Sequence, residues 1–181
     1  MKILDVGCGG GGSLTRFLQL GFTPQNLYGI DIIEERIDEA KGKYPNMNFT
    51  CDDAASMPYG SDKFDLVVES TMFVQITDVK LAQQIAEEML RVTKPLGYIL
   101  VIDWRYSKPG NSTYLGVSQK RIKKMFSVGK HSKIICQTSG ALIPPIGRLI
   151  SKYLHSLYFF TAALMPILVG QKSTLIQKTS I

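Results

Sequence analysis

The sequence predicts an α/β protein in which helices cover both faces of a mainly parallel sheet. Seven short apolar runs alternate with amphipathic segments along the chain, which is the pattern of parallel strands joined by helices. A glycine-rich stretch follows the first run, and acidic residues stand at or near the ends of several others. A chain of 181 residues suits a single domain. Within it we distinguish a first half, residues 1–103, and a second half, residues 104–181.

Five of the seven strands are expected in the first half. Each is an apolar run long enough to cross a sheet once and is bounded by turn residues. They cover residues 2–6, 26–32, 47–51, 64–70 and 98–104.

Two short helices separate the first three strands. The first covers residues 13–20, with Ser13 as its N-cap, and stops at Gly21. The second covers residues 33–44. Ile33, Ile37 and Ala40 are expected on one face of it.

A longer helix precedes the fifth strand. Thr77 or Asp78 is expected to cap it, and the turn at residues 94–97 to end it. Its apolar positions recur at helical spacing, at Leu81, Ile85, Met89 and Leu90.

The second half is predicted to hold a basic helix, a sixth strand, another helix and a last strand. The basic helix covers residues 117–127, the sixth strand 132–138 and the last strand 173–180. The other helix follows Pro144 and Pro145. Its apolar stripe is expected to consist of Leu149, Ile150, Tyr153, Leu154 and Leu157.

Composition excludes several classes of protein. Three cysteines without a C-x-x-C pair give no disulfide framework and favour a reducing, cytoplasmic location. The two histidines form no ligand pair with a cysteine, so no metal site is expected. The most apolar segment, residues 157–169, is shorter than the about 20 residues of a membrane span, which indicates a buried or interfacial helix.

Charge is divided unevenly between the two halves. Residues 1–103 contain 9 Lys and Arg and all 15 Asp and Glu, whereas residues 104–181 contain 12 Lys and Arg and no acid. Such a run is usually a solvated basic face. It also fits a surface for an anionic acceptor, an acidic membrane or a nucleic acid.

Carboxylates gather at one edge of the predicted sheet. Asp5, Asp31, Asp53, Glu69 and Asp103 lie at or near the carboxyl ends of five strands. In open sheets of this kind, ligands bind beyond those ends. Because buried carboxylates are costly without partners, this clustering indicates a functional site.

Two cofactors fit the glycine-rich loop. Gly7, Gly9 and Gly12 satisfy G-x-G-x-x-G, and Asp31 follows Gly12 at about the spacing of a ribose-binding carboxylate, so a nicotinamide dinucleotide is one candidate. Asp5, however, stands two residues before Gly7, where that fingerprint has an apolar residue. A carboxylate there suits a cofactor without phosphate and with a positive end, such as S-adenosylmethionine.

At this point the first half resembles a known family. The stretches ILDVGCGGGG, YGIDI, CDDAASMPY, FDLVVES and MLRVTKPLGYILVID are similar, in order, to five motifs of class I S-adenosylmethionine-dependent methyltransferases. Leu96 replaces a glycine of the last motif. The second half resembles small bacterial methyltransferases of the type-11 kind. The resemblance implies a Rossmann-like three-layer fold with an antiparallel last strand inserted beside the fifth.

The resemblance also implies a cofactor site. Its residues are expected to be Asp5, Gly7, Gly9, Asp31, Ile32, Asp53, Ala54, Glu69 and Ser70. Asp31 would accept from both ribose hydroxyls and Asp53 from the adenine amino group. Methyl transfer from a sulfonium needs mainly a nucleophile held in line, and a base only if the acceptor must lose a proton.

Asp103 is the candidate catalytic base, with Glu69 second. Trp104, Arg105, Tyr106 and Tyr114 are candidates for an acceptor pocket in the second half, with packing as the alternative. The expected methyl acceptor is a small molecule or a cell-envelope intermediate, and its charge is left open between anionic and neutral.

Other functions stay open. One is an NAD(P)-dependent oxidoreductase, and another is a module that binds cofactor without catalysis. Nucleic-acid methylation is disfavoured, because ESTM stands where an Asn-Pro-Pro-Tyr type motif would follow the fourth strand. Peripheral membrane contact and homo-oligomers are both compatible with the sequence. The helices that usually precede the first strand of the family are missing, which predicts a truncated chain or a lid from another chain.

Overall fold

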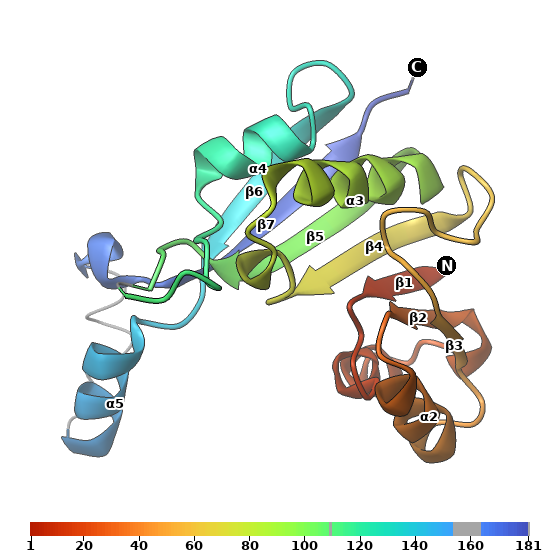
Figure 1. The fold of residues 1–181 in the computed structure, drawn as a ribbon, viewed down its shortest axis with the longest axis horizontal. Helices are drawn as coiled ribbons and strands as arrows, with labels where there is room; N and C mark the ends of the chain where they lie inside the picture. The colour runs from red at the N-terminus through yellow and green to blue at the C-terminus, as the bar shows by residue number, and fades with distance from the viewer. Residues whose placement is uncertain (109, 154–163, 181) are drawn as a thin grey trace.

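Seven strands form one mixed sheet in the computed structural model, which describes residues 1–108, 110–153 and 164–180 (Figure 1). The strand order is β3-β2-β1-β4-β5-β7-β6. The strands are β1 (Ile3–Val6), β2 (Leu27–Asp31), β3 (Asn48–Cys51), β4 (Phe64–Ser70), β5 (Thr93–Trp104), β6 (Ser132–Ser139) and β7 (Gln171–Lys178). The expected α/β, Rossmann-like fold is confirmed.

The sheet is parallel from β3 to β5 and antiparallel around β7. β1 pairs in parallel with β2 and with β4, and β4 pairs in parallel with β5. β7 pairs antiparallel with both β5 and β6. The prediction of an antiparallel last strand beside the fifth is therefore confirmed.

Helices cover both faces of the sheet. The α-helices are α1 (Thr15–Gln19), α2 (Glu34–Lys43), α3 (Val79–Val92), α4 (Gln119–Met125) and α5 (Pro144–Tyr153). Short 3-10 helices are η1 (Gly12–Leu14), η2 (Pro24–Asn26), η3 (Phe73–Gln75) and η5 (Pro166–Leu168). Figure 1 shows α3 and α4 along one side of the sheet, and α5 projecting away from it.

Each face has its own apolar core, because successive residues of a strand point to opposite sides. On the α3 and α4 face, Val67 and Ile99 pack with Ala86, Met89 and Ile122. On the α1 and α2 face, the core is built from the other set of strand residues, such as Ile3, Leu27 and Val68, together with Ile37 and Phe49. The alternation places Asp5 and Asp31 on the α1 and α2 face, and Glu69 and Asp103 on the other.

The prediction that Ser13 caps the first helix is wrong. Ser13 lies within η1, and α1 begins at Thr15 without a side-chain cap. The hydroxyl of Ser13 instead donates to the carboxylate of Asp5. A buried carboxylate has no water to accept from, whereas an exposed helix end has, so the hydroxyl stabilises the carboxylate.

The end of α3 also differs from the expected one. The helix stops at Val92, and residues 94–97 are a bulge within β5, since Phe64 pairs with Thr93 and Leu66 with Tyr98. At the amino end of α3, the carboxylate of Asp78 accepts from the N–H groups of Lys80 and Leu81. Of the two predicted caps, Asp78 is the one confirmed.

Part of the predicted second half lies outside the described residues. This holds for Leu154 and Leu157 of the expected stripe and for residues 157–163 of the most apolar segment. Among the helices that the structure describes, none is long and apolar enough to cross a membrane.

Candidate functional site

The glycine-rich loop between β1 and η1 turns through three left-handed glycines. Gly7, Gly9 and Gly11 have φ of 72°, 51° and 78°, a region that side chains with a Cβ rarely adopt. The N–H groups of Gly7 and Cys8 both donate to the backbone oxygen of Ile30, at 2.8 and 3.1 Å. The loop is therefore tied to β2 and presents its backbone at the carboxyl edge of the sheet.

Asp31 joins this loop to the start of α2. One oxygen of its carboxylate accepts from the N–H of Gly9 at 2.8 Å, and the other from the N–H of Ile33 at 3.0 Å. An ionised carboxylate has about four acceptor sites, so both oxygens retain capacity for ligand hydroxyls. The sequence predicted Asp31 as a ligand residue, and the structure places it on a cavity wall.

A cavity of about 370 Å³ opens where β1, β2 and β4 end. Its lining consists of Gly7, Ile30, Asp31, Ile32, Ile33, Arg36, Asp52, Asp53, Ala54, Ser70, Thr71, Met72, Gln75, Ile76, Leu81 and Ile85. We call it the cofactor cavity, after the cofactor site that the sequence predicted at several of these residues. Ile32 is 70% exposed, so its side chain is accessible to cover a flat ligand.

The charges around the cofactor cavity disfavour phosphate. Three carboxylates line it, from Asp31, Asp52 and Asp53, against the single cation of Arg36. A pyrophosphate would be repelled by this set, whereas a ligand with a net positive charge would be attracted. The side chain of Asp53 also accepts from the N–H of Ala55 at 2.8 Å, so it orders its own loop.

Asp5 lies beneath the loop and is almost completely buried. One of its oxygens accepts from the hydroxyl of Ser13, and the other has no partner among the described residues. Burial, and to a smaller extent the nearby charge of Asp31, raises the pKa of Asp5 to about 7. Asp5 is therefore a buried acid that a nearby positive charge would stabilise in its ionised form.

Glu69 and Asp103 lie together under the segment that follows β4. Glu69 accepts from the N–H of Met72 at 3.1 Å, and its other oxygen has no partner in the described part of the chain. Asp103 accepts from the N–H groups of Val74 and Trp104, at 2.9 and 2.7 Å. Burial raises the pKa of Glu69 well above its usual value and that of Asp103 to about 6.

Arg121 of α4 closes this buried group from the other side. Its two terminal nitrogens donate to the backbone oxygens of Leu115 and Ile76, each at 2.7 Å. Burial lowers the pKa of Arg121, while the charges of Asp103 and Glu69 raise it. Arg121 thus links the segment after β4 to the segment after β5.

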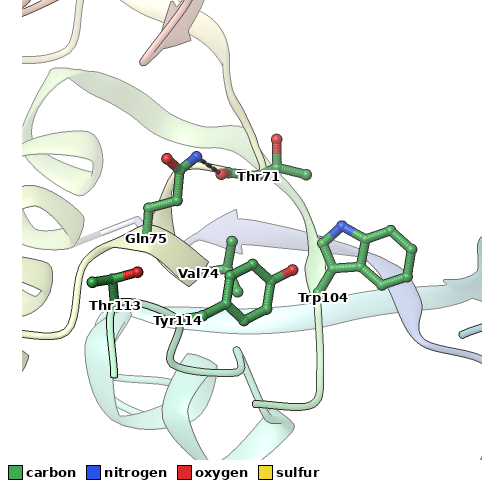
Figure 2. Close-up of a pocket in the computed structure, with 6 residues that line it drawn as sticks. All are labelled: Thr71, Val74, Gln75, Trp104, Thr113 and Tyr114. Carbon is green, nitrogen blue, oxygen red and sulfur yellow. Dashed lines mark hydrogen bonds between the residues drawn. The ribbon is translucent and has the colours of Figure 1, made fainter. Parts of the chain in front are cut away.

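A second cavity, of about 430 Å³, adjoins the first. It is lined by Thr71, Val74, Gln75, Trp104, Thr113 and Tyr114. Figure 2 shows the hydrogen bond of 2.8 Å from the amide of Gln75 to the backbone oxygen of Thr71 on one side, and the rings of Trp104 and Tyr114 on the other. Thr71 and Gln75 line both cavities. We call this one the acceptor cavity, after the acceptor pocket that the sequence predicted around Trp104 and Tyr114, and none of its lining residues is charged.

The structure gathers most of the predicted ligand residues around the cofactor cavity. Gly7, Asp31, Ile32, Asp53, Ala54 and Ser70 line it, whereas Asp5, Gly9 and Glu69 lie outside its lining. Trp104 and Tyr114 line the acceptor cavity, but Arg105 and Tyr106 do not. Neither cavity is lined by Asp103 or Glu69, so their catalytic assignment stays a prediction.

Several lining residues were not foreseen from the sequence. Thr71, Met72 and Gln75 belong to the segment after β4, whose path depends on the buried carboxylates beneath it. Thr71 has a φ of 60°, for which the sequence carries no signal. Leu81 was predicted only as an apolar position of α3, and the structure shows it partly exposed in the lining of the cofactor cavity.

Comparison with known proteins points to one chemistry. The model of a family described as a methyltransferase domain matches residues 1–142. An uncharacterised methyltransferase of Synechocystis sp. is 32% identical over 102 residues, which cover 56% of this chain and 46% of that protein.

Two further relatives have named substrates. A 2-methyl-6-phytyl-1,4-hydroquinone methyltransferase of Synechocystis sp. is 36% identical over 107 residues, covering 56% of this chain and 31% of that protein. A demethylmenaquinone methyltransferase of Renibacterium salmoninarum is 29% identical over 105 residues, which cover 58% of this chain and 42% of that protein. The chain spans less than half the length of each of these three relatives.

Solved structures share the fold. A S-adenosylmethionine-dependent methyltransferase of Methanosarcina mazei aligns with a TM-score of 0.68 and 18% identity, covering 99% of this chain and 92% of that one. The [4+2]-cyclase SpnF aligns with a TM-score of 0.67 and 17% identity, and the alignment covers 99% of this chain and 74% of that one. The second alignment shows that this fold alone does not fix the reaction.

Proposed function

The chain belongs to the class I S-adenosylmethionine-dependent methyltransferase family, and from this membership we propose that it transfers a methyl group from S-adenosylmethionine to a neutral, ring-bearing small molecule. The observation that carries the proposal is the pair of adjoining cavities at the carboxyl edge of the sheet. One has an acidic lining and the other an uncharged, aromatic one. Because Thr71 and Gln75 line both, a donor and an acceptor would meet across them.

The chemistry of the cofactor cavity fits S-adenosylmethionine. Its three carboxylates suit a ligand with two cationic groups and no phosphate. Asp5 and Glu69 each have one buried oxygen without a partner among the described residues. The positive charge of such a ligand would stabilise the ionised form of both carboxylates. Glycine at position 7 also suits the packing of this loop, because a Cβ there would come within 3.0 Å of the side chain of Met72, another residue of the lining.

The chain's own residues would bind and orient the donor. Asp31 would accept from the ribose hydroxyls, and Ile32 and Leu81 would pack on the adenine. Asp53 would accept from the adenine amino group, and the loop from Gly7 to Gly9 would approach the amino-acid end. When bound, S-adenosylmethionine supplies a methyl group already activated by its sulfonium. Rate enhancement then comes mainly from holding the acceptor in line and excluding water.

The acceptor cavity favours a neutral, ring-bearing molecule. Trp104 and Tyr114 offer flat surfaces for stacking, and Thr71, Thr113 and Gln75 offer hydrogen bonds that would orient a hydroxyl or carbonyl group. The two relatives above are named as methyltransferases of a phytyl hydroquinone and of demethylmenaquinone, and a further relative, from Aspergillus fumigatus, is named as a sterol methyltransferase. All three named substrates are ring-bearing, lipid-soluble molecules. We keep Asp103 and Glu69 as proposed bases, although their contacts favour a role in positioning the segment after β4.

Calorimetric titration with S-adenosylmethionine, its demethylated product and NAD tests the proposal. The wild type should bind both adenosyl ligands and not NAD. Asp31→Asn should weaken their binding by about thirtyfold or more, since charge-assisted hydrogen bonds contribute about 1.5 to 3 kcal/mol each. Asp38→Asn, an exposed position on α2 outside the cavity, is the matched control and should bind normally.

Other functions predict different results. Tighter binding of NAD than of S-adenosylmethionine would favour the oxidoreductase and overturn the proposal. Binding of S-adenosylmethionine without methyl transfer to any of a panel of hydroquinones, phenols and sterols would favour a module that binds cofactor without catalysis. Methylation of anionic acceptors alone would contradict the neutral acceptor while leaving the cofactor assignment intact.

A further inference from the structure

Three large apolar side chains are exposed within one short segment beside β7. Leu164 is 64% exposed, Met165 49% and Ile167 70%. The hydroxyl of Tyr106, which is itself exposed, donates to the backbone oxygen of Ile167 at 2.7 Å. We call these four residues the apolar patch. Single exposed apolar residues are ordinary on a protein surface, but a contiguous group indicates an interaction site.

The apolar patch is continuous with the base of α5. The N–H of Ile143 donates to the backbone oxygen of Leu168 at 2.9 Å, and Leu142 forms a β-bridge with Val169. α5 begins at the next residue, Pro144, and projects away from the sheet (Figure 1). It carries two exposed cations, Arg148 and Lys152. Apolar and basic groups therefore meet at the same corner of the molecule.

The charge of the chain favours an anionic partner at this corner. Residues 104–181 contain 12 Lys and Arg and no Asp or Glu, whereas residues 1–103 carry all 15 acids. In the field of an anionic surface, this asymmetry would turn the second half toward the surface and the first half away.

We propose that the apolar patch and α5 dock on an anionic lipid surface. Aliphatic side chains gain free energy in the interfacial region of a bilayer, and each Lys or Arg near anionic headgroups adds to binding. A nucleic acid would use the cations but gain little from Leu164, Met165 and Ile167. An acidic protein would have to bury those side chains in a complementary groove, whereas a bilayer needs no such shape.

Docking would place the acceptor cavity beside the lipid. The backbone of Gly170 packs on Trp104, since a Cβ added there would come within 2.9 Å of the indole ring. Trp104 lines the acceptor cavity, and Gly170 lies three residues after Ile167. Under the proposed function, a lipid-soluble acceptor would thus reach the cavity from the membrane. The docking itself does not depend on that function.

Sedimentation with lipid vesicles tests the proposal on the 181-residue chain. Vesicles of phosphatidylcholine with phosphatidylserine should bind the protein, more weakly as salt is raised, and vesicles of phosphatidylcholine alone should bind it little. The triple variant L164S/M165S/I167S should lower the affinity by about tenfold or more. The double variant R148E/K152E should lower it by about tenfold or more as well.

Matched variants in the first half serve as controls. Leu20→Ser removes an apolar side chain that is 73% exposed, and K41E/K80E reverses two exposed cations. Both should bind the anionic vesicles as well as the wild type does. Thermal unfolding should be unchanged in every variant, because the replaced side chains are exposed. Titration with S-adenosylmethionine is an independent readout, so loss of docking is distinguishable from failure of the proposed function.

Three results would overturn the docking. The first is absence of binding to anionic vesicles at low salt. The second is equal vesicle binding by the wild type and the triple variant. The third is self-association in light scattering that the triple variant abolishes while vesicle binding persists, because a second copy of the chain would then cover the apolar patch.

Discussion

At the scale of single residues, the site depends on backbone conformations that few residue types adopt. Gly7 and Gly9 are left-handed, and so are several larger residues, Thr71 and Leu96 among them. For a residue with a Cβ, this conformation costs roughly 1 to 2 kcal/mol. Glycine removes that cost where the loop must approach a ligand. At Thr71 and Leu96, favourable contacts with the surrounding structure must offset that cost.

Replacing Gly7 with alanine should impair the cofactor site. The residue has a φ of 72°, and its new Cβ would come within 3.0 Å of Cγ and Sδ of Met72. We expect a loss of stability of roughly 1 to 2 kcal/mol and a marked loss of affinity for S-adenosylmethionine in calorimetric titration. Gly12→Ala is the control in the same loop, because a Cβ there meets nothing within 4 Å. Equal effects of the two variants would contradict the geometry of the loop.

Replacing Leu96 with glycine should stabilise the protein. Leu96 has a φ of 62° in the bulge of β5 and is 55% exposed, so little burial is lost with its side chain. Relief of the left-handed conformation outweighs the greater entropy of glycine in the unfolded chain, for a net gain of about 0.5 to 1 kcal/mol. Urea unfolding measures the gain. Leu20→Gly, at an exposed position without a left-handed φ, should instead be neutral or destabilising.

The buried acids predict how stability varies with pH. The pKa of Asp5 is raised to about 7 in the folded state from a usual value of 3.8. Its contribution to the free energy of unfolding is therefore complete below about pH 4 and is lost as the pH rises through about 7. The raised pKa values of Glu69 and Asp103 act in the same direction. The ligand-free protein should become less stable from about pH 5 to about pH 8.

The substitution Asp5→Asn isolates the contribution of Asp5 to this pH dependence of stability. The amide oxygen can still accept from Ser13, but the side chain no longer ionises. Urea unfolding at several pH values should show a flatter decline for the variant, with a gain of about 2 kcal/mol or more over the wild type near pH 8. Asp38→Asn, at an exposed position, should follow the wild-type curve. A wild-type stability that rises over this range would contradict the burial of these acids.

At the scale of elements, the sequence predicted the strands better than the segments between them. Strands such as β1 and β4 lie inside the sheet with helices on both faces, so their sequences are mainly apolar and easily identified. The bulge at residues 94–97 was missed, because Leu96 adopts a conformation that its type disfavours. The sequence also did not predict that Thr71 and Gln75 line the two cavities, for a different reason. The path of that segment is determined by buried contacts from distant parts of the chain.

Asp103 makes the main buried contact that determines the path of the segment after β4. It holds η3 through the N–H of Val74, and Arg121 holds the residue after η3 through the backbone oxygen of Ile76. Asp103→Asn keeps one acceptor but turns an N–H group toward the other donor. We expect about 2 kcal/mol of destabilisation and faster hydrogen exchange at Val74 and Trp104. Binding of S-adenosylmethionine should be little changed.

The same variant separates positioning from catalysis. If Asp103 were only a base, stability and amide exchange would be unchanged while turnover was lost. Asp62→Asn is the matched control at the opposite edge of the sheet. Its ion pair with Lys178 is partly exposed, so its loss should cost less than about 1 kcal/mol.

At the scale of the whole molecule, the last strand joins the two halves of the chain. β7 lies between β5 and β6, and it is the only strand with which β6 pairs in the described sheet. The family match ends at residue 142, before β7 begins. The first half therefore contributes the residues of the cofactor cavity, but the sheet that holds them continues into residues 171–178.

Truncation after residue 142 should abolish cooperative folding, although the remaining chain includes the whole family match. β5 would lose seven paired residues, β6 would lose its partner strand, and the buried side chain of Ile176 would be missing from the core. We expect no sharp transition in thermal unfolding followed by circular dichroism, and no shift on addition of S-adenosylmethionine.

Two substitutions in the intact chain test whether the loss of folding on truncation comes from β7. Ile176 is fully buried against the α3 and α4 face, whereas Leu175 points to the other face and is only half-buried. Ile176→Ser should cost roughly 3 kcal/mol or more, since it leaves a cavity and a buried hydroxyl, and Leu175→Ser clearly less. A cooperative transition in the truncated chain, or equal costs for the two variants, would mean that β7 only lies against a sheet that residues 1–142 complete. If both results are as expected, the cofactor cavity depends on β7, although the family match ends before that strand begins.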